Sequence, residues 1–357
     1  MRHFLWPVVL LLWRISSAIA AEPAVRCLPL AEARQAMGDE SHEPFFSVLQ
    51  PREIAAMTGT VLTGTASTGS TPAERRDEVR RRFVDAVRAF TPEEDAALVE
   101  MTDHLRGLLE TRYPLMAREP WRYVKFDSSL VGGFPHTRGP WIFLSDRVVE
   151  RLVKNWKTIQ DKKGSVAGLT TLLHEQMHVL ERTYPERFKK LYVDEYGFRF
   201  GPVRDDPWIA ARRISNPDAL RWEWVFPVKR EGKEEYYAPQ MLLRDGPEVL
   251  RMGADFQFAC VRVEPAGDGF RTVQKDGRPI VVQLAEVPEY LAAMPIRGGL
   301  DHPNELTAYL FEQVFIQDVA QEGATPLEKG AAAAGRAVVG LKPEVEQVRT
   351  WFRANLR

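Results

Sequence analysis

The sequence is poor in cysteine and almost without net charge, and each scarcity argues against a class of protein. Its 357 residues include only 2 cysteines, too few for a disulfide-rich scaffold or a metal cluster built from cysteines. With 48 Lys and Arg against 49 Asp and Glu, the chain lacks the basic excess that binds nucleic acid or an anionic membrane. We therefore expect no nucleic-acid partner. A hydrophobic fraction of 45% suits a globular protein, and the length allows two domains or one elaborated domain.

A long apolar run stands at the N-terminus. Arg2 precedes the apolar stretch Phe4–Trp13, and the small residues of Ser17–Ala20 follow it. This order predicts a signal peptide over residues 1–20 and a secreted or periplasmic protein. Because the run is too short to span a bilayer comfortably and is followed by Arg14, we expect no stable membrane anchor after cleavage.

The two cysteines lie far apart in the sequence. Cys27 is close to the expected mature N-terminus, and Cys260 lies in the apolar stretch Phe256–Val263, a predicted strand. A disulfide between them would tether the N-terminal segment to the body of an exported protein. The alternative is two separate thiols, with Cys260 buried.

The chain has only 7 histidines, and two of them stand in the pentapeptide His174-Glu175-Gln176-Met177-His178. On a helix, side chains four residues apart emerge on the same face, close enough to share one metal ion. Glu175 projects about 100° around the helix, where it can reach a water molecule on the metal without being a ligand. This pattern is typical of zinc hydrolases. The alternative is a solvated or core-packed helix that carries two unrelated histidines.

The surrounding sequence favours a buried helix. Ser165 is a plausible N-cap for a helix over 166–182, and Tyr184-Pro185 would end it, because the residue before proline avoids the helical region. An apolar face is supplied by Leu169, Leu172, Leu173, Met177 and Leu180. The two histidines would lie along one border of this face.

In this segment the chain resembles the zincin metallopeptidases, whose zinc takes a third protein ligand. The metzincin branch would need glycine at 181 and histidine at 184, but the chain has Glu181 and Tyr184. The gluzincin branch takes a glutamate from a later helix, often within Asn-Glu-x-x-Ala, and this pattern is met by Asn304–Ala308. The resemblance therefore implies that His174, His178 and Glu305 bind Zn²⁺. Pro303 favours a helix start just before Glu305.

The gap between His178 and Glu305 is longer than in well-known gluzincins, so a large insertion is expected between the two helices. Asp194 and Glu195 lie at a more usual distance and are the rival third ligands, although they lack the surrounding pattern. His302 is a weaker candidate. Glu181 is interpreted as an outer partner of the metal site or as a surface charge.

The segment before the histidine helix reads as two strands and a helix. Strands are predicted over Trp121–Phe126 and Trp141–Leu144, with a turn-rich loop over 132–139 between them and a helix over 147–161 after them. This element order resembles the N-terminal half of a zincin catalytic unit. The resemblance implies that the last strand borders the cleft and pairs with an extended peptide substrate, a role that falls to Trp141 and Ile142.

Two residues of the turn-rich loop are candidates for the cleft. His136 and Arg138 are expected either at the cleft mouth or in a solvent-exposed polar turn. A Tyr or His is needed to polarise the scissile carbonyl group. The candidates for that role are Tyr309, His302, Tyr236 and Tyr237.

Overall, the sequence predicts an α+β fold: a zincin-like unit with a small mixed sheet, an active-site helix and C-terminal helices, interrupted by an antiparallel β insertion. The expected units are a loop-rich segment and linker over 21–71, a helical region with the histidine helix over 72–200, the insertion over 201–298 and a helical part over 299–357. Hairpins are predicted over 222–243, around a charged turn, and over 270–284, around Asp276-Gly277. A Gly/Ala-rich stretch, 330–340, precedes a terminal helix over 343–356.

The leading hypothesis is an exported zinc metallopeptidase that acts on a peptide or protein, with Glu175 as general base. One alternative keeps the zincin fold but has a non-proteolytic role, as a binding or structural metalloprotein. The other is a metal-dependent amidase or cell-wall hydrolase, because water activation does not by itself specify a peptide bond.

Overall fold

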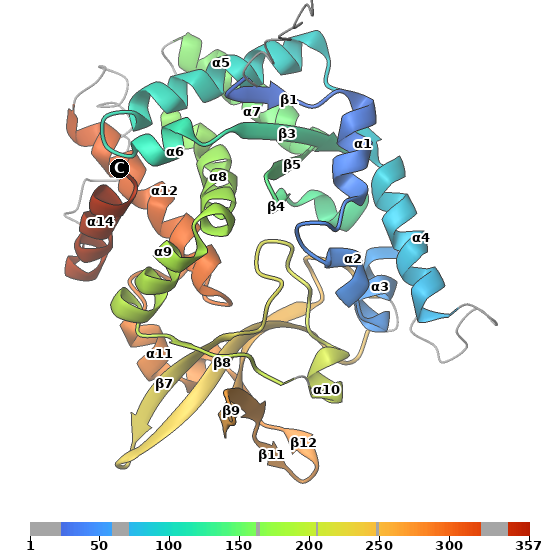
Figure 1. Cartoon of the computed structure of the whole chain (residues 1–357), viewed down its shortest axis with the longest axis vertical. Coiled ribbons are helices and arrows are strands. Elements are labelled where there is room, and N and C mark those ends of the chain that lie inside the picture. Colours follow the sequence, from blue (N-terminus) through green and yellow to red (C-terminus); the bar gives the residue numbers. More distant parts are fainter. Residues whose placement is uncertain (1–22, 59–70, 162–164, 205, 248–249, 323–341) are drawn as a thin grey trace, which may run out of the picture.

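The computed structural model describes residues 23–58, 71–161, 165–204, 206–247, 250–322 and 342–357, which fold into a mixture of helices and sheets (Figure 1). The α+β class is confirmed. The expected signal peptide, the linker around 59–70 and the stretch 330–340 lie outside the described residues.

The α-helices are α1 (Leu30–Gly38), α2 (Phe45–Val48), α3 (Pro51–Thr58), α4 (Pro72–Asp85), α5 (Pro92–Leu109), α6 (Pro114–Arg118), α7 (Asp146–Gln160), α8 (Thr170–Thr183), α9 (Pro185–Lys190), α10 (Pro207–Ala210), α11 (Pro288–Ala293), α12 (Pro303–Glu322) and α14 (Pro343–Asn355). Short helical turns are η1 (Leu130–Gly133), η2 (Val166–Leu169), η3 (Leu191–Glu195) and η4 (Leu284–Glu286). The strands are β1 (Val25–Cys27), β2 (Val87–Arg88), β3 (Trp121–Phe126), β4 (His136–Arg138), β5 (Trp141–Ser145), β6 (Arg199–Phe200), β7 (Trp224–Arg230), β8 (Lys233–Leu243), β9 (Phe256–Ala266), β10 (Gly269–Thr272), β11 (Gln274–Lys275), β12 (Arg278–Pro279) and β13 (Val281–Gln283).

The first sheet is mixed and has the order β1-β3-β5-β4, with β2 also pairing with β3. β1, β3 and β5 run parallel, and β4 is antiparallel at the edge. α5 and α7 pack against this sheet. α8 packs against β5 and β4, and the chain then continues through α9 to the second sheet (Figure 1). Residues of β3, β5, α8 and α12 share one large apolar core, which fixes α8 between the sheet and α12.

The N-terminal segment is more ordered than expected. In place of a loop-rich stretch, β1 adds to the first sheet in register with Trp121 of β3, and α1, α2 and α3 follow. These helices are short, and their apolar residues pack with Phe83 of α4 into a second cluster that includes Phe45 and Phe46. The prediction was wrong because helices this short carry too few turns to show a hydrophobic period.

The predicted strands at 121–126 and 141–144 are confirmed, but the loop between them contains β4. Its residues His136 and Arg138 pair with Phe143 and Trp141 of β5. β5 is therefore an inner strand, and β4 forms the edge of the sheet. The expectation that Trp141 and Ile142 lie on a free edge is wrong. The strand was missed because three residues beside a glycine-rich turn give no alternating pattern.

The helices around the histidine motif follow the prediction closely. The Ser145 hydroxyl accepts the Val148 N–H at the start of α7. Ser165 caps the short turn η2 instead, and α8 begins after it at Thr170. The apolar face of this segment is fully buried: Leu169, Leu172, Leu173, Met177 and Leu180 are all 0% exposed. The histidine helix is thus a core element, as predicted.

The second sheet follows α9 and is antiparallel, with the order β10-β9-β8-β7-β6 (Figure 1). The first predicted hairpin is confirmed as β7 and β8, joined by Glu231 and Gly232 at φ 50° and 76°. The second hairpin exists only at its tip, where Asp276 and Gly277 join β11 to β12. Its legs do not pair as strands with each other, because β10 and β13 both pair with the long strand β9.

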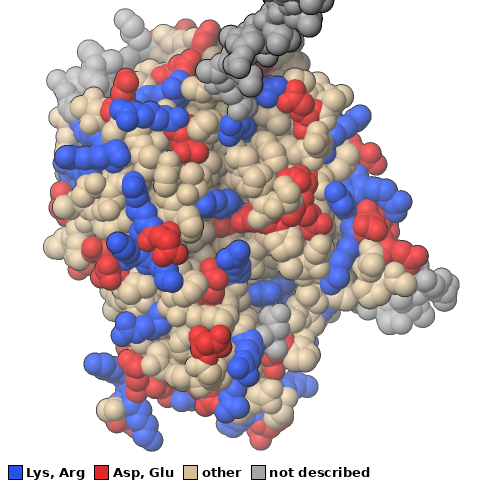
Figure 2. Space-filling model, viewed as in Figure 1, with Lys and Arg blue, Asp and Glu red and all other residues tan. Residues whose placement is uncertain are grey.

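The surface does not gather charge of one sign on the face that Figure 2 shows, where Lys and Arg are interspersed with Asp and Glu. Among the described residues, no helix is both long enough and apolar enough to cross a membrane.

The terminal helix α14 packs against α12. Its bounds, Pro343–Asn355, lie close to the predicted range 343–356.

The two cysteines are separate thiols. Cys27 lies on β1 and is partly buried, and Cys260 lies on β9 and is buried. The tethering disulfide is therefore absent. Burial raises the pKa of both thiols, that of Cys260 to about 12, so both stay protonated near neutral pH.

These thiols give a direct chemical test. The folded protein is expected to react slowly with a maleimide reagent, because burial shields both sulfur atoms and disfavours the reactive thiolate. Protein unfolded in urea without a reductant should take up two labels per chain, as measured by intact mass. Labelling that appears only after reduction would instead reveal a disulfide.

Candidate metal centre

The packing of α8 against α12 brings together three side chains that could hold a metal ion. His174 and His178 project from α8, and Glu305 projects from the first turn of α12. One ligand atom of each lies within 4.8 Å of the other two. His174 Nε2 is 3.3 Å from Glu305 Oε2, and His178 Nε2 is 3.9 Å from Glu305 Oε1. Within the described ranges, no other group of three His, Cys, Asp or Glu converges in this way.

The start of α12 explains the position of Glu305. Pro303 is the first helical residue, and the ring of His302 caps the helix by accepting the Asn304 N–H at Nδ1, 3.2 Å away. Gly299 adopts φ +65° just before the helix and approaches its first turn: a Cβ atom there would lie 2.5 Å from the Glu305 carbonyl carbon. The turn before α12 can thus press against it only because glycine has no side chain.

A segment of the second half of the chain also holds Glu305. Asn216 Nδ2 donates a hydrogen bond to Glu305 Oε1 at 2.9 Å, and Asn304 Nδ2 donates to the Asp218 carbonyl oxygen at 3.0 Å. Ser215 is fixed in turn by the buried carboxylate of Glu53, which accepts both its N–H and its hydroxyl. These residues were not predicted as site residues, since nothing local in the sequence indicates that the 215–218 segment reaches α12.

Both histidines hydrogen-bond to a carboxylate on the side away from Glu305. His174 Nδ1 lies 2.8 Å from Glu312 Oε1, and His178 Nδ1 lies 2.8 Å from Glu181 Oε2. Glu181 also accepts the Tyr192 hydroxyl at 2.7 Å. A proton on each Nδ1 leaves the Nε2 lone pair free for a metal ion. The interpretation of Glu181 as an outer partner fits this geometry, and the surface charge is wrong because the residue is buried.

The charges of this centre favour a cation. Burial lowers the pKa of His174, but hydrogen bonds to Glu305 and Glu312 outweigh it and raise that pKa well above its usual value. Burial likewise opposes ionisation of Glu305, yet the hydrogen bond from His174 holds the pKa of Glu305 well below its usual range. A proton on His174 thus occupies a place that a metal ion would take, so the two compete.

Glu175 faces the same space from the next position on α8. It is buried, and its Oε2 atom has no hydrogen-bond partner. Burial, with the nearby Asp218 carboxylate, raises the pKa of Glu175 well above its usual value. His178 Nε2 is also buried without a partner. Two polar atoms of this site, Glu175 Oε2 and the ligand atom His178 Nε2, are thus buried without a hydrogen-bond partner.

The rival third ligands lie elsewhere. Asp194 is exposed on the turn η3, and Glu195 Oε2 accepts a hydrogen bond from Gln347 Nε2 at 2.6 Å. Neither belongs to the converging group. Of the two alternatives predicted from the sequence, Glu305 lies close enough to both histidines to share a metal ion with them, and the Asp194–Glu195 pair does not.

A cavity of about 440 Å³ opens beside His174 and Glu305, which both line it, whereas the buried His178 does not. Glu175, Tyr309 and His136 also line it, but His302, Trp141 and Ile142 do not. The Tyr309 ring packs edge-on against His174, with centroids 4.7 Å apart. Neither Tyr236 nor Tyr237 lines the cavity; their hydroxyls donate to Glu234 and Glu235 on β8. Tyr309 is therefore the one predicted carbonyl-polarising residue that reaches the cavity.

His136 and Arg138 are not part of an exposed turn. Both are buried. Arg138 Cζ lies 4.6–6.0 Å from the ring centroids of four phenylalanines, Phe45, Phe46, Phe83 and Phe143. His136 stacks on Phe143, and burial lowers the pKa of its imidazole to about 3, so the ring is neutral near pH 7.

Arg182 ties the edge strand to three other segments. From the last turn of α8 it donates to both carboxylate oxygens of Glu43 at 2.9 Å, to the Thr137 carbonyl oxygen at 3.2 Å and to the Pro217 carbonyl oxygen at 2.6 Å. The Thr137 N–H donates to Asp218 Oδ1 at 2.7 Å. Arg182 lies one turn after His178 on α8. In the sequence, only this spacing indicates that Arg182 lies near the site.

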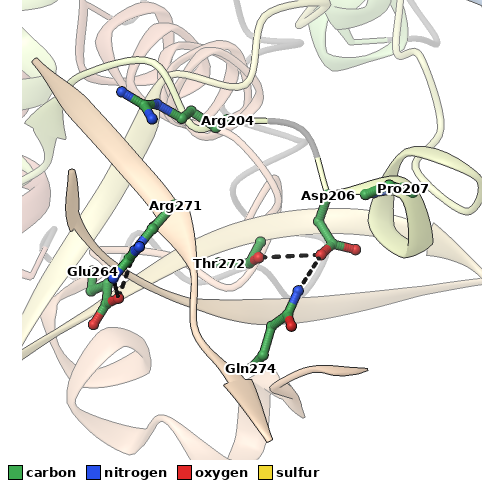
Figure 3. A pocket seen from close by; sticks show the side chains of 7 residues that line it. All are labelled: Arg204, Asp206, Pro207, Glu264, Arg271, Thr272 and Gln274. Carbon is green, nitrogen blue, oxygen red and sulfur yellow. Dashed lines mark hydrogen bonds and ion pairs between the residues drawn. The ribbon is translucent and has the colours of Figure 1, made fainter. Parts of the chain in front are cut away.

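A second hollow, of about 530 Å³, lies on the second sheet (Figure 3). Two of its charged groups pair with each other, Arg271 and Glu264 at 2.6 Å, and Gln274 donates to Asp206 at 2.9 Å. Asp206 also caps α10. These side chains do not form a group of three His, Cys, Asp or Glu like that of the candidate metal centre.

Compared with protein-family models, with curated proteins and with solved structures, the chain matches none.

The close approach of Gly299 predicts a positional effect on Glu305, the candidate metal ligand. Gly299→Ala is expected to lower the affinity for Zn²⁺ by about 10–100-fold, because the new Cβ atom displaces the first turn of α12. Gly277→Ala is the matched control: Gly277 has a similar φ of +75° but nothing within 4 Å. Both variants should lose about 1–2 kcal/mol of folding stability to backbone strain. Equal zinc affinities, measured by chelator competition, would contradict the positioning role.

Proposed function

We propose that the chain is an exported zinc-dependent metallopeptidase of the gluzincin type. The observation that carries the proposal is the convergence of His174, His178 and Glu305 within 4.8 Å, with Glu175 beside them. Two imidazoles and one carboxylate form a ligand set that catalytic zinc takes in hydrolases. The export rests on the predicted signal peptide, and the zincin-like unit on the resemblance in the two ligand segments.

The residues around the three ligands also fit zinc. Glu312 and Glu181 would orient the rings and make their Nε2 atoms better donors. The buried Nε2 atom of His178 has no partner among the described residues, and a metal ion would satisfy it. When bound, zinc acidifies a water molecule and polarises a carbonyl oxygen.

In the proposed mechanism the protein supplies a proton carrier and a hydrogen-bond donor. Glu175 Oε2 takes the proton of the attacking water and later passes it to the leaving amine nitrogen. The Tyr309 hydroxyl donates to the carbonyl oxygen as negative charge develops there. Tyr309 is 42% exposed in the cavity, so its ring can turn toward a substrate.

Removing the third ligand tests the metal set. Glu305→Ala should lose most of its zinc on dialysis, because two imidazoles alone bind weakly and Asn216 is left without its acceptor. Glu195→Ala should keep about one zinc per chain, like the unmodified protein. Zinc content by mass spectrometry of the metal decides between the two. Loss of zinc only in the Glu195 variant would move the third ligand to η3.

Removing the proton carrier tests the reaction. Glu175→Gln should keep its zinc, because this residue is not a ligand. Its peptide hydrolysis is expected to fall by at least about 10²–10⁴-fold, as for the loss of a general base. Cleavage of a peptide library, followed by mass spectrometry with zinc content measured on the same sample, checks both points. Full activity in this variant would refute the mechanism.

A further inference from the structure

The cavity in front of the metal centre has an unusually apolar wall. Among the described residues, five large hydrophobic side chains are exposed, and three of them, Phe134, Phe258 and Tyr309, line this one cavity. Phe134 is 54% exposed and Phe258 43% exposed. A gathering of exposed aromatic side chains costs hydration free energy, and on soluble proteins it marks binding sites.

Apart from Tyr309 on α12, the wall comes from segments outside the two ligand helices. Met241 on β8 and Phe258 on β9 belong to the second sheet, whereas Met57 belongs to α3 near the N-terminus. The flexible thioether of methionine adapts to apolar ligands of different shape. These side chains thus form an adaptable apolar surface that continues directly to Glu175 and the metal ligands.

Phe134 is held at the end of this wall by glycine. A Cβ atom on Gly253 would lie 2.6 Å from the Phe134 ring, and one on Gly132 would lie 3.0 Å from it. Gly253 has φ +82° and Gly132 has φ +69°. The aromatic ring therefore sits in a niche between the loop before β4 and the loop before β9.

The edge strand β4, by contrast, has few main-chain groups available for hydrogen bonds to the main chain of a peptide. Thr137 is the central residue of β4, and its N–H and carbonyl point away from β5 to Asp218 and Arg182. Pro135, just before β4, has no N–H. Gly139, just after β4, directs its N–H to Glu43 Oε2 at 3.5 Å. Strand addition would have to break the contacts of Thr137.

We propose that this site selects its substrate by a bulky apolar side chain, bound between Phe134, Met241 and Phe258, and not by strand pairing with β4. The inference rests on the proposed peptidase function and names its substrate class: peptides with Phe, Leu or Met beside the cleaved bond. Acidic side chains are excluded, since the lining contains Asp and Glu but no Lys or Arg.

The test uses the zinc-loaded full chain and blocked, internally quenched peptides that differ at one position: Ala, Leu, Phe, Asp or Lys. The kcat/KM for Phe or Leu should exceed that for Ala by at least about tenfold, and Asp should be the poorest. Phe258→Ser should reduce the Phe-to-Ala ratio by about three- to tenfold. Phe200→Ser is the matched control, because Phe200 is 44% exposed but lies on β6 and does not line the cavity. It should leave the ratio unchanged.

A binding measurement separates this inference from the proposed function. Titration calorimetry of the Phe and Asp peptides against the zinc-loaded Glu175→Gln variant should show tighter binding of the Phe peptide. Preferential binding without cleavage by the unmodified protein would refute the peptidase and leave the apolar site standing. Cleavage with no preference for Phe or Leu, or an equal fall of the ratio in both serine variants, would overturn the inference. Binding of a long-chain acyl amide but not of the Phe peptide would overturn it as well.

Discussion

The contact between α8 and α12 places Glu305 within 3.9 Å of both His174 and His178, although a whole second sheet separates them in the sequence. Three polar ligands, two of them on the buried side of a core helix, would be costly without partners. The structure offsets this cost with carboxylates behind the rings and with the N-terminal end of α12, whose dipole favours a negative charge. The same contact brings Glu175 of α8 and Tyr309 of α12 to one cavity.

The sequence predicts the parts of the site that local geometry determines. A spacing of four residues on a helix is enough to place His174 beside His178, and the apolar face of α8 predicts its burial. Glu305 needed a second kind of information, the resemblance of Asn304–Ala308 to a known motif. The predicted helix start at Pro303 agrees with the structure, in which α12 begins at Pro303 and the ring of His302 caps it.

The remaining residues depend on contacts that no local pattern records. Glu312 reaches His174, and Asn216 reaches Glu305, only after distant elements have packed. The strand β4 was missed for a related reason, because a three-residue strand is defined by its partner and not by its own sequence. The assignment of Trp141 and Ile142 to the cleft failed with it: a further strand lies outside theirs.

Peptidases that bind their substrates along a strand edge read the main chain, which all peptides share. In this protein the outward main-chain groups of the edge strand β4, those of Thr137, already hydrogen-bond to Asp218 and Arg182. If the proposed apolar wall is the main source of binding, the range of substrates is set by a few side chains of the second sheet. Selectivity would then change readily through substitutions at Met241 or Phe258 without any change in the metal centre.

The hydrogen bond from Asn216 to Glu305 has a consequence for how the molecule could be divided. The second sheet has the appearance of an added module, but the segment that leads into it supports Glu305, the proposed third ligand, and is itself anchored by Glu53 of α3. Replacing the sheet by a short loop would therefore release Glu305 along with the wall of the cavity. The second sheet and the proposed centre are therefore mechanically coupled, so neither can be exchanged without the other.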